Sequence, residues 1–107
     1  MARVLLSAFA CEPGAGSEPG IGWGWARGLA ALGHEVTVLT RPCHRPRIEE
    51  WLRLRAADAR SMAFLYYDLP GFEHSWYRGN LGVQAYYVPW QWGASSLALA
   101  EHRRRPF

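Results

Sequence analysis

A glycine-rich loop at residues 11–22 carries the residue types best suited to binding chemistry. It reads Cys-Glu-Pro-Gly-Ala-Gly-Ser-Glu-Pro-Gly-Ile-Gly, and it lies between a short apolar run and a helical pattern. Glycine lets the backbone adopt positive φ values and lets a ligand approach the main chain closely. The start of a helix offers free N–H groups and a partial positive charge. We therefore expect the loop to bind an anionic group such as a phosphate.

The expected binding set consists of the polar residues and glycines at the start of the predicted helix. Its members are Gly16, Ser17, Glu18, Gly20 and Gly22. We expect Ser17 to cap the helix through its hydroxyl group and Pro19 to occupy the first turn, where a missing N–H costs little. Glu18 suits the positive end of the helix.

Two familiar phosphate loops do not fit these residues. Pro19 stands where the dinucleotide fingerprint needs its third glycine, and the run that ends at Thr40 is followed by Arg41 instead of the ribose-binding acid. A P-loop requires Gly-Lys-Ser or Gly-Lys-Thr, and the chain contains no lysine. The sequence thus disfavours a nicotinamide dinucleotide and excludes P-loop nucleotide hydrolysis, and we expect no cofactor.

Three strand-like runs alternate with helical patterns, which is typical of an α/β fold with a parallel sheet. The strands are expected at Arg3–Phe9, Glu35–Thr40 and Met62–Tyr67, and the helices at about Pro19–Leu32 and Ile48–Arg60. The continuous apolar residues of the first run suggest a strand at the centre of the sheet. Right-handed crossovers then predict a Rossmann-like sheet in the order 3-2-1 with flanking helices.

The first helical pattern contains one apolar stripe that we expect to be buried. The stripe consists of Ile21, Trp25, Leu29 and Leu32, and Gly33 is expected to end the helix. Trp23 lies off this stripe, either lining a ligand cleft or packing against a buried neighbour.

Residues after the second and third strands are further candidates, because the carboxyl ends of parallel strands share one edge of the sheet. Arg41 is expected either to meet a phosphate or an acidic acceptor, or to be a solvated loop residue. Asp68 either faces the cleft or stabilises a turn. His44 has no partner at a recognisable spacing and is expected to be exposed.

The C-terminal third is rich in aromatic residues, with a weak point at Arg78-Gly79-Asn80. Two helical pieces are expected there, and Pro89 should kink or break the second unless it lies near a helix start. One apolar face consists of Val83, Tyr86, Tyr87, Trp90, Ala94 and Leu97. This face is suited to core packing, to contact with a membrane surface or to lining an acceptor pocket.

The overall composition narrows the class of protein further. The 107 residues allow one small domain, and no apolar run reaches the ~20 residues of a membrane span. The start lacks the features of a signal peptide, so the cytoplasm is the expected location. Cys11 and Cys43 lack metal-ligand spacing, and no metal site is expected. The net charge of +3 owes much to the arginines at 103–105, which have no nucleic-acid recognition pattern around them.

The N-terminal 41 residues resemble the start of the GT-B glycosyltransferases of the retaining family 4 type. The resemblance rests on three stretches: Val-Leu-Leu-Ser-Ala-Phe-Ala-Cys-Glu-Pro-Gly at 4–14, Gly-Ser-Glu-Pro-Gly-Ile-Gly-Trp at 16–23 and Leu-Gly-His-Glu-Val-Thr-Val-Leu-Thr at 32–40. In that family the glycine loop faces the cleft between two Rossmann-like domains, near the donor diphosphate and the acceptor. The resemblance carries this role to Gly20 and Gly22, and also to Ser17 and Glu18.

The same resemblance implies transfer of a sugar from a nucleotide-sugar donor to a glycan, lipid or small-molecule acceptor. Members of the family continue into a fourth strand and a second domain that holds most donor contacts. Residues 1–107 would then be an incomplete N-terminal domain, inactive without the missing C-terminal domain. Apart from the resemblance, peripheral contact with the inner membrane face is one of the open options for the aromatic C-terminal third. Two alternatives remain open, a non-enzymatic module that binds a phosphorylated ligand and a nonfunctional truncation.

Overall fold

The computed structural model describes residues 2–14, 16–55, 60–68 and 79–107, and within these it leaves the side chains of Glu18 and of residues 79–86 undescribed. Its strands are β1 (Arg3–Ser7), β2 (Glu35–Thr40) and β3 (Met62–Tyr66), and its helices are α1 (Ser17–Ala31), the short 3-10 helix η1 (Pro42–His44), α2 (Arg45–Leu54) and α4 (Gly79–Arg104). The alternation of strands and helices up to β3 is the one expected from the sequence. Gly33 follows α1 with a φ of 91°, as expected for a glycine that ends a helix.

The strands form a three-stranded parallel sheet in the order β1-β2-β3. Val4 lies opposite Val36, and Val36 lies opposite Met62. The α/β class and the parallel sheet are therefore confirmed, but β1 is not central: β2 is the middle strand, and β1 lies at an edge. A continuous apolar run indicates that a strand is buried on both faces. It does not indicate how many strands lie beside that strand in the sheet.

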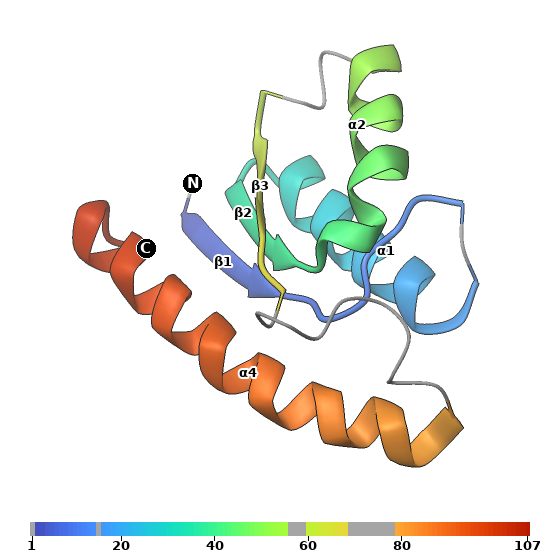
Figure 1. Ribbon diagram of the computed structural model, residues 1–107. Coiled ribbons are helices and arrows are strands. Elements are labelled where there is room, and N and C mark those ends of the chain that lie inside the picture. Colours follow the sequence, from blue (N-terminus) through green and yellow to red (C-terminus); the bar gives the residue numbers. More distant parts are fainter. Residues whose placement is uncertain (1, 15, 56–59, 69–78) are drawn as a thin grey trace.

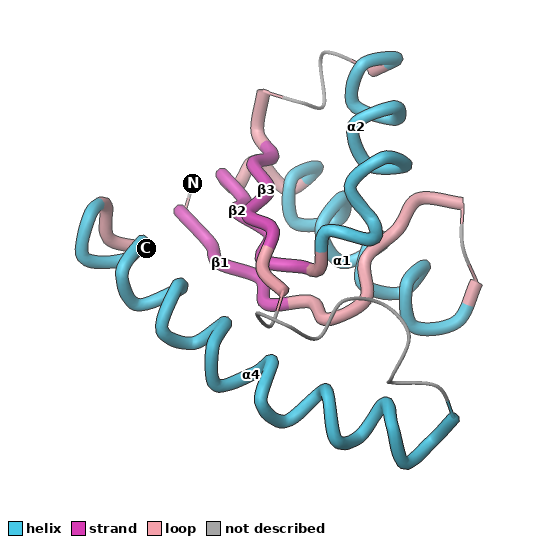
Figure 2. The backbone as a smooth tube through the Cα atoms, in the orientation of Figure 1, coloured by secondary structure: helices cyan, strands magenta, loops and turns pink. Residues whose placement is uncertain are grey.

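Helices cover both faces of the sheet, which gives three layers (Figure 1). Helices α1 and α2 lie on one face, and α4 crosses the other (Figure 2). Side chains of β2 alternate between the layers: Val36 and Val38 join the core beneath α1 and α2, whereas Leu39 joins Trp90 of α4. Among the described residues, no helix is both long and apolar enough to cross a membrane.

Helix α1 buries a face other than the expected one. Trp23 and Ala26 are buried, whereas Ile21, Trp25 and Leu32 are 61%, 63% and 76% exposed. The helix has two apolar faces. The face that contains Trp23 is the buried one, because the Trp23 ring packs against rings of α2 and β3. The ring of Trp23 lies 4.9 Å from that of Trp51 in α2 and 6.0 Å from that of Phe64 in β3, measured between centroids. The open option for Trp23 is thus settled as a buried neighbour contact.

Helix α4 runs through Pro89 without a break, so the expected break at this proline is wrong. The residue after the proline anchors the helix to the sheet: Trp90 is fully buried, and its Nε1 donates a hydrogen bond to the carbonyl oxygen of Tyr67 at 2.8 Å. Ala94 is buried with Trp90, and Leu97 packs against them, so this part of the expected apolar face is core. The first of the two expected helical pieces lies outside the described residues.

Candidate functional site

The carboxyl edge of the sheet brings together charged and polar residues from three loops. Glu12 follows β1, Arg41 and His44 follow β2, and Asp68 follows β3. Parallel strands necessarily collect their following loops at one edge, which is where α/β proteins bind ligands. Contacts join Glu12, His44 and Arg41 into a polar cluster at this edge, and this cluster defines the candidate site.

His44 lies at the centre of this cluster. It is only 7% exposed, so the expectation of an exposed histidine was wrong. Its Nδ1 lies 3.1 Å from Oε1 of Glu12, and its Nε2 lies 3.4 Å from Nη2 of Arg41. Both partners precede His44 in the sequence, Glu12 by 32 positions and Arg41 by three positions. Such a long-range pairing leaves no local spacing pattern, so sequence periodicity had no signal for it.

One tautomer of the neutral imidazole ring satisfies both contacts. A guanidinium group only donates hydrogen bonds, so Nε2 of His44 must accept from Arg41. The ring proton is then on Nδ1, from which it is donated to the Glu12 carboxylate. Burial lowers the pKa of His44 below its usual value of 6.5, outweighing the opposite effect of Glu12. His44 is accordingly neutral near pH 7.

Arg41 is held beside this histidine by Phe9 in the loop after β1. Its Nε donates to the carbonyl oxygen of Phe9 at 2.7 Å, and its Cζ lies 3.8 Å from the centroid of the Phe9 ring. Of the two expectations for Arg41, the solvated loop residue does not fit these contacts. A guanidinium that is stacked and hydrogen-bonded in this way is a fixed cation, which is the form in which arginine recognises phosphate or carboxylate groups.

The N-terminus of α1 adjoins the cluster through Glu12. The backbone N–H of Glu12 donates to the carbonyl oxygen of Pro19 in the first turn of α1 at 2.9 Å. Gly16 is the N-cap residue, and no side chain caps the helix. The expected hydroxyl cap by Ser17 is therefore wrong, because Ser17 is already in the helix, with a φ of 55°. A Cβ at Gly16 would meet no described atom within 4 Å.

The other members of the expected binding set differ in what surrounds them. A Cβ at Gly22 would lie 2.3 Å from the carbonyl oxygen of Ala10, so this glycine is needed for α1 to pack against the loop. Gly20 lies half-buried in the first turn of α1, and the side chain of Glu18 is outside the description. Ligand contacts by Gly16, Ser17, Glu18, Gly20 and Gly22 stay a prediction.

Both cysteines lie near the loop, and both are protonated near pH 7. Burial raises the pKa of Cys11 to about 12. The pKa of Cys43 is also raised, chiefly by burial, with Asp68 among the charges that contribute. The cleft and turn roles expected for Asp68 both stay predictions. In the described part of the chain, no three His, Cys, Asp or Glu side chains are grouped as a metal site.

Glu12 and His44 are the members of the site that sequence reasoning missed. Residues that follow parallel strands share one edge of the sheet, and this rule pointed to Arg41 and Asp68. The same rule applies to Glu12 and His44. Comparison with known proteins adds no relative: no family model, no curated protein and no solved structure matches the chain.

Proposed function

We propose that the chain is the N-terminal part of a GT-B glycosyltransferase, in which the carboxyl edge of the sheet binds the diphosphate of a nucleotide-sugar donor. The observation that carries the proposal is a fixed cation, Arg41, in the loop after β2, while the loop after β1 leads to a helix N-terminus without a side-chain cap. The resemblance of residues 4–40 to the family supports the same reading. Each feature favours an anion, and together they suit a diphosphate.

This arrangement suits the chemistry of sugar transfer. When the bond between sugar and diphosphate breaks, negative charge develops on the departing phosphate oxygens. Preorganised N–H donors and a fixed guanidinium stabilise that charge without having to reorganise during the reaction. Glu12 and His44 contribute indirectly, since they hold Arg41 in place.

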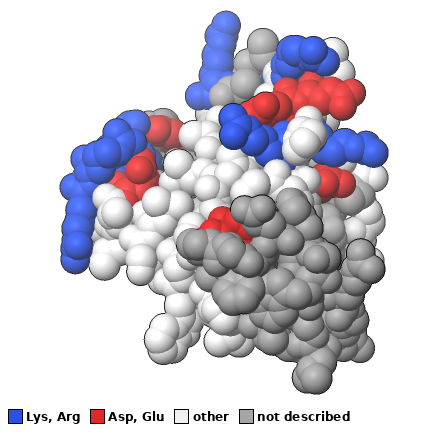
Figure 3. Space-filling model, viewed as in Figure 1, with Lys and Arg blue, Asp and Glu red and all other residues white. Residues whose placement is uncertain are grey.

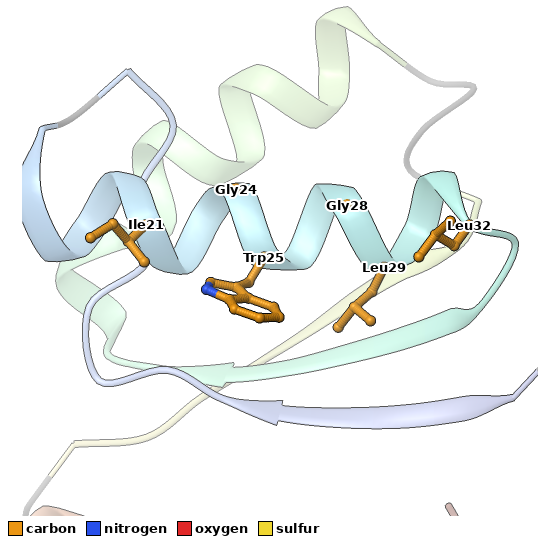
Figure 4. A pocket seen from close by; sticks show the side chains of 6 residues that line it. All are labelled: Ile21, Gly24, Trp25, Gly28, Leu29 and Leu32. Atoms are coloured by element: carbon orange, nitrogen blue, oxygen red, sulfur yellow. The ribbon is translucent and has the colours of Figure 1, made fainter.

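The proposal extends to the fold. A β1-β2-β3 sheet with helices on both faces is compatible with the first half of a Rossmann-like domain, in which a fourth strand would pair with β1. The free edge of β1 supports this reading, as does the apolar stripe of α1 that is exposed above it (Figure 4). The second wall of the cleft, with most donor contacts, would belong to a C-terminal domain.

Contact with a membrane surface is part of the proposal as well. Val88, Trp92 and Leu99 are 55%, 77% and 48% exposed, and their spacing places them on one side of α4. Arginines follow at the C-terminal end of the same helix, where basic side chains gather in the space-filling view (Figure 3). Exposed apolar residues beside arginines suit an anionic lipid surface.

The diphosphate site can be tested on the chain by nuclear magnetic resonance. Titration of the ¹⁵N-labelled protein with pyrophosphate, UDP or GDP should shift the amide signals of Gly16, Ser17 and Gly20. The substitution Arg41→Gln should weaken binding about tenfold, the effect expected when a charge-assisted hydrogen bond is lost. Arg53→Gln is the matched control, because Arg53 is exposed on α2, away from the loop. Unchanged loop signals with all three ligands would refute the proposed site.

A further inference from the structure

A groove that combines apolar and basic residues lies between helix α2 and the loop after β1. Its volume is about 300 Å³, and no member of the Glu12–His44–Arg41 cluster lines it. The helix contributes Arg47, Glu50, Trp51, Leu54 and Arg55, and the loop contributes Pro13 and Gly14. Small-molecule sites have volumes of about 300 to 1,000 Å³, so this α2 groove has room for a small ligand.

Trp51 and Leu54 give the α2 groove an apolar part. They are three positions apart and therefore lie on one face of the helix. The side chain of Leu54 is 68% exposed. The half-buried ring of Trp51 is held in place, because its centroid lies 4.9 Å from that of Trp23 and within 4.8 Å of the Cζ atoms of Arg27 and Arg55. Such a fixed ring loses little conformational freedom when a ligand packs against it.

The charged residues of the α2 groove are two arginines and one glutamate, so the groove is net positive. Arg55 is fixed over the Trp51 ring. Arg47 differs from its neighbour Arg45, which pairs with Glu49 at 2.7 Å: within the part of the chain that the structure describes, Arg47 has no ion pair. Its guanidinium is thus available to an anionic ligand.

The N-terminus of α2 adds to the positive potential beside Arg47. The first turn of this helix contains no acidic residue, and no side chain caps it. Free N–H groups at a helix start carry a partial positive charge, which favours acidic residues there and disfavours an arginine. Arg47 is therefore placed against the local preference of the helix. Departures of this kind are expected at functional sites.

We propose that the α2 groove is a binding site for a small aromatic oxyanion, that is, a phosphate or carboxylate attached to a flat ring system. The anionic group lies against Arg47 and the N-terminus of α2. The ring system packs against Trp51 and Leu54. Because Arg41 and His44 do not line the groove, this site is separate from the proposed diphosphate site and does not depend on sugar transfer.

Charge and polarity favour this ligand over its two halves. An inorganic anion would pair with Arg47 but would leave Leu54 in water, and an uncharged aromatic molecule would cover Leu54 but would leave the guanidinium without a partner. The carboxylate of Glu50 disfavours negative charge in the middle of the groove. It thereby directs the anionic group to the Arg47 end.

The test is a nuclear magnetic resonance titration of the ¹⁵N-labelled chain with 1-naphthyl phosphate. The indole N–H signal of Trp51 and the backbone amide of Arg47 should shift, and these signals are distinct from the Gly16 and Ser17 amides that report on the diphosphate site. Inorganic phosphate and 1-naphthol should each bind at least tenfold more weakly, because each meets only one part of the groove. An unshifted Trp51 signal, or either half binding as tightly as the whole, would overturn the proposal.

Two pairs of variants test the two parts of the groove separately. Arg47→Gln should weaken binding of 1-naphthyl phosphate about tenfold, whereas Arg53→Gln, on the same helix but outside the groove, should not. Leu54→Ser should weaken it severalfold, and Leu99→Ser, at an exposed leucine of α4, should leave it unchanged. Circular dichroism verifies that each variant is folded. Equal losses within either pair would refute the site, because binding would then not depend on the groove.

Discussion

At the scale of single residues, the imidazole of His44 connects the loop after β1 with the end of β2. It donates to Glu12 and accepts from Arg41, so the position of the guanidinium depends on the neutral form of the ring. Protonation would remove the acceptor at Nε2 and would place a second positive charge beside Arg41. The cluster is therefore built for the neutral histidine.

The neutral state of His44 leads to a pH dependence of stability. Because burial lowers the pKa of His44 in the folded chain, the unfolded chain takes up its proton at higher pH, near 6.5. The contribution of His44 to the free energy of unfolding is thus fully present above pH 6.5, and it is lost as the pH falls from 6.5 through the folded pKa. Urea denaturation on both sides of pH 6.5 measures this slope. His44→Asn should flatten the slope and His102→Asn, at an exposed site, should not; equal slopes in both variants would contradict the assignment.

Two glycines of α1 make a matched pair for a test of packing. Gly22→Ala should lower the free energy of unfolding by about 1 to 3 kcal/mol, because the new Cβ collides with the Ala10 carbonyl oxygen. Gly28→Ala should raise it by about 0.5 to 1 kcal/mol, since a Cβ there meets open space and alanine favours the helix. Thermal denaturation of both variants measures the difference. A harmless Gly22→Ala would show that α1 does not lie against the loop.

At the scale of elements, α4 depends on one residue for its attachment to the sheet. Trp90→Ala should cost about 3 to 5 kcal/mol, since it removes a fully buried ring and the partner of the Tyr67 carbonyl oxygen. Trp92→Ala, two positions further along, should stay within about 0.5 kcal/mol, because its side chain is 77% exposed. Chemical denaturation compares the two. Similar losses would mean that α4 does not lie on the sheet through Trp90.

The side of α4 that faces away from the sheet provides a test of membrane contact. The chain should sediment with vesicles that contain phosphatidylserine and much less with phosphatidylcholine vesicles, because the arginines need an anionic surface. Trp92→Glu should reduce the bound fraction severalfold by placing a charge at the lipid boundary. Trp25→Glu on α1 is the control for the loss of an exposed tryptophan. Equal sedimentation of both variants would remove α4 from the contact.

At the scale of the whole molecule, we expect residues 1–107 by themselves to transfer no sugar. Catalysis requires donor and acceptor held in attack geometry, which is worth about 7 to 11 kcal/mol in well-ordered systems. In the proposed arrangement, the sheet edge of this chain would supply only one wall of such a cleft. The assay combines the purified chain with radiolabelled nucleotide-sugars and mixed acceptors, with unfolded chain as background. Steady turnover would show that these residues hold a complete site.

The sequence by itself determined the order and type of the elements up to β3. The bounds of β2 are those expected, Glu35–Thr40, because a β-branched apolar run between turn residues is a local signal. The sequence also indicated that Arg41 and Asp68 lie at the carboxyl edge of the sheet. Parallel strands bring their following loops together at this edge, whatever packs around the strands.

Only the tertiary structure decided which face of α1 is buried and what surrounds His44. Helical periodicity defines the faces of a helix, but two apolar faces compete here, and the ring contacts of Trp23 with α2 and β3 settle the outcome. The partners Glu12 and His44 lie 32 positions apart, as do Phe9 and Arg41. Such pairs meet only after the sheet has formed, because the parallel pairing of β1 with β2 is what brings the two loops together.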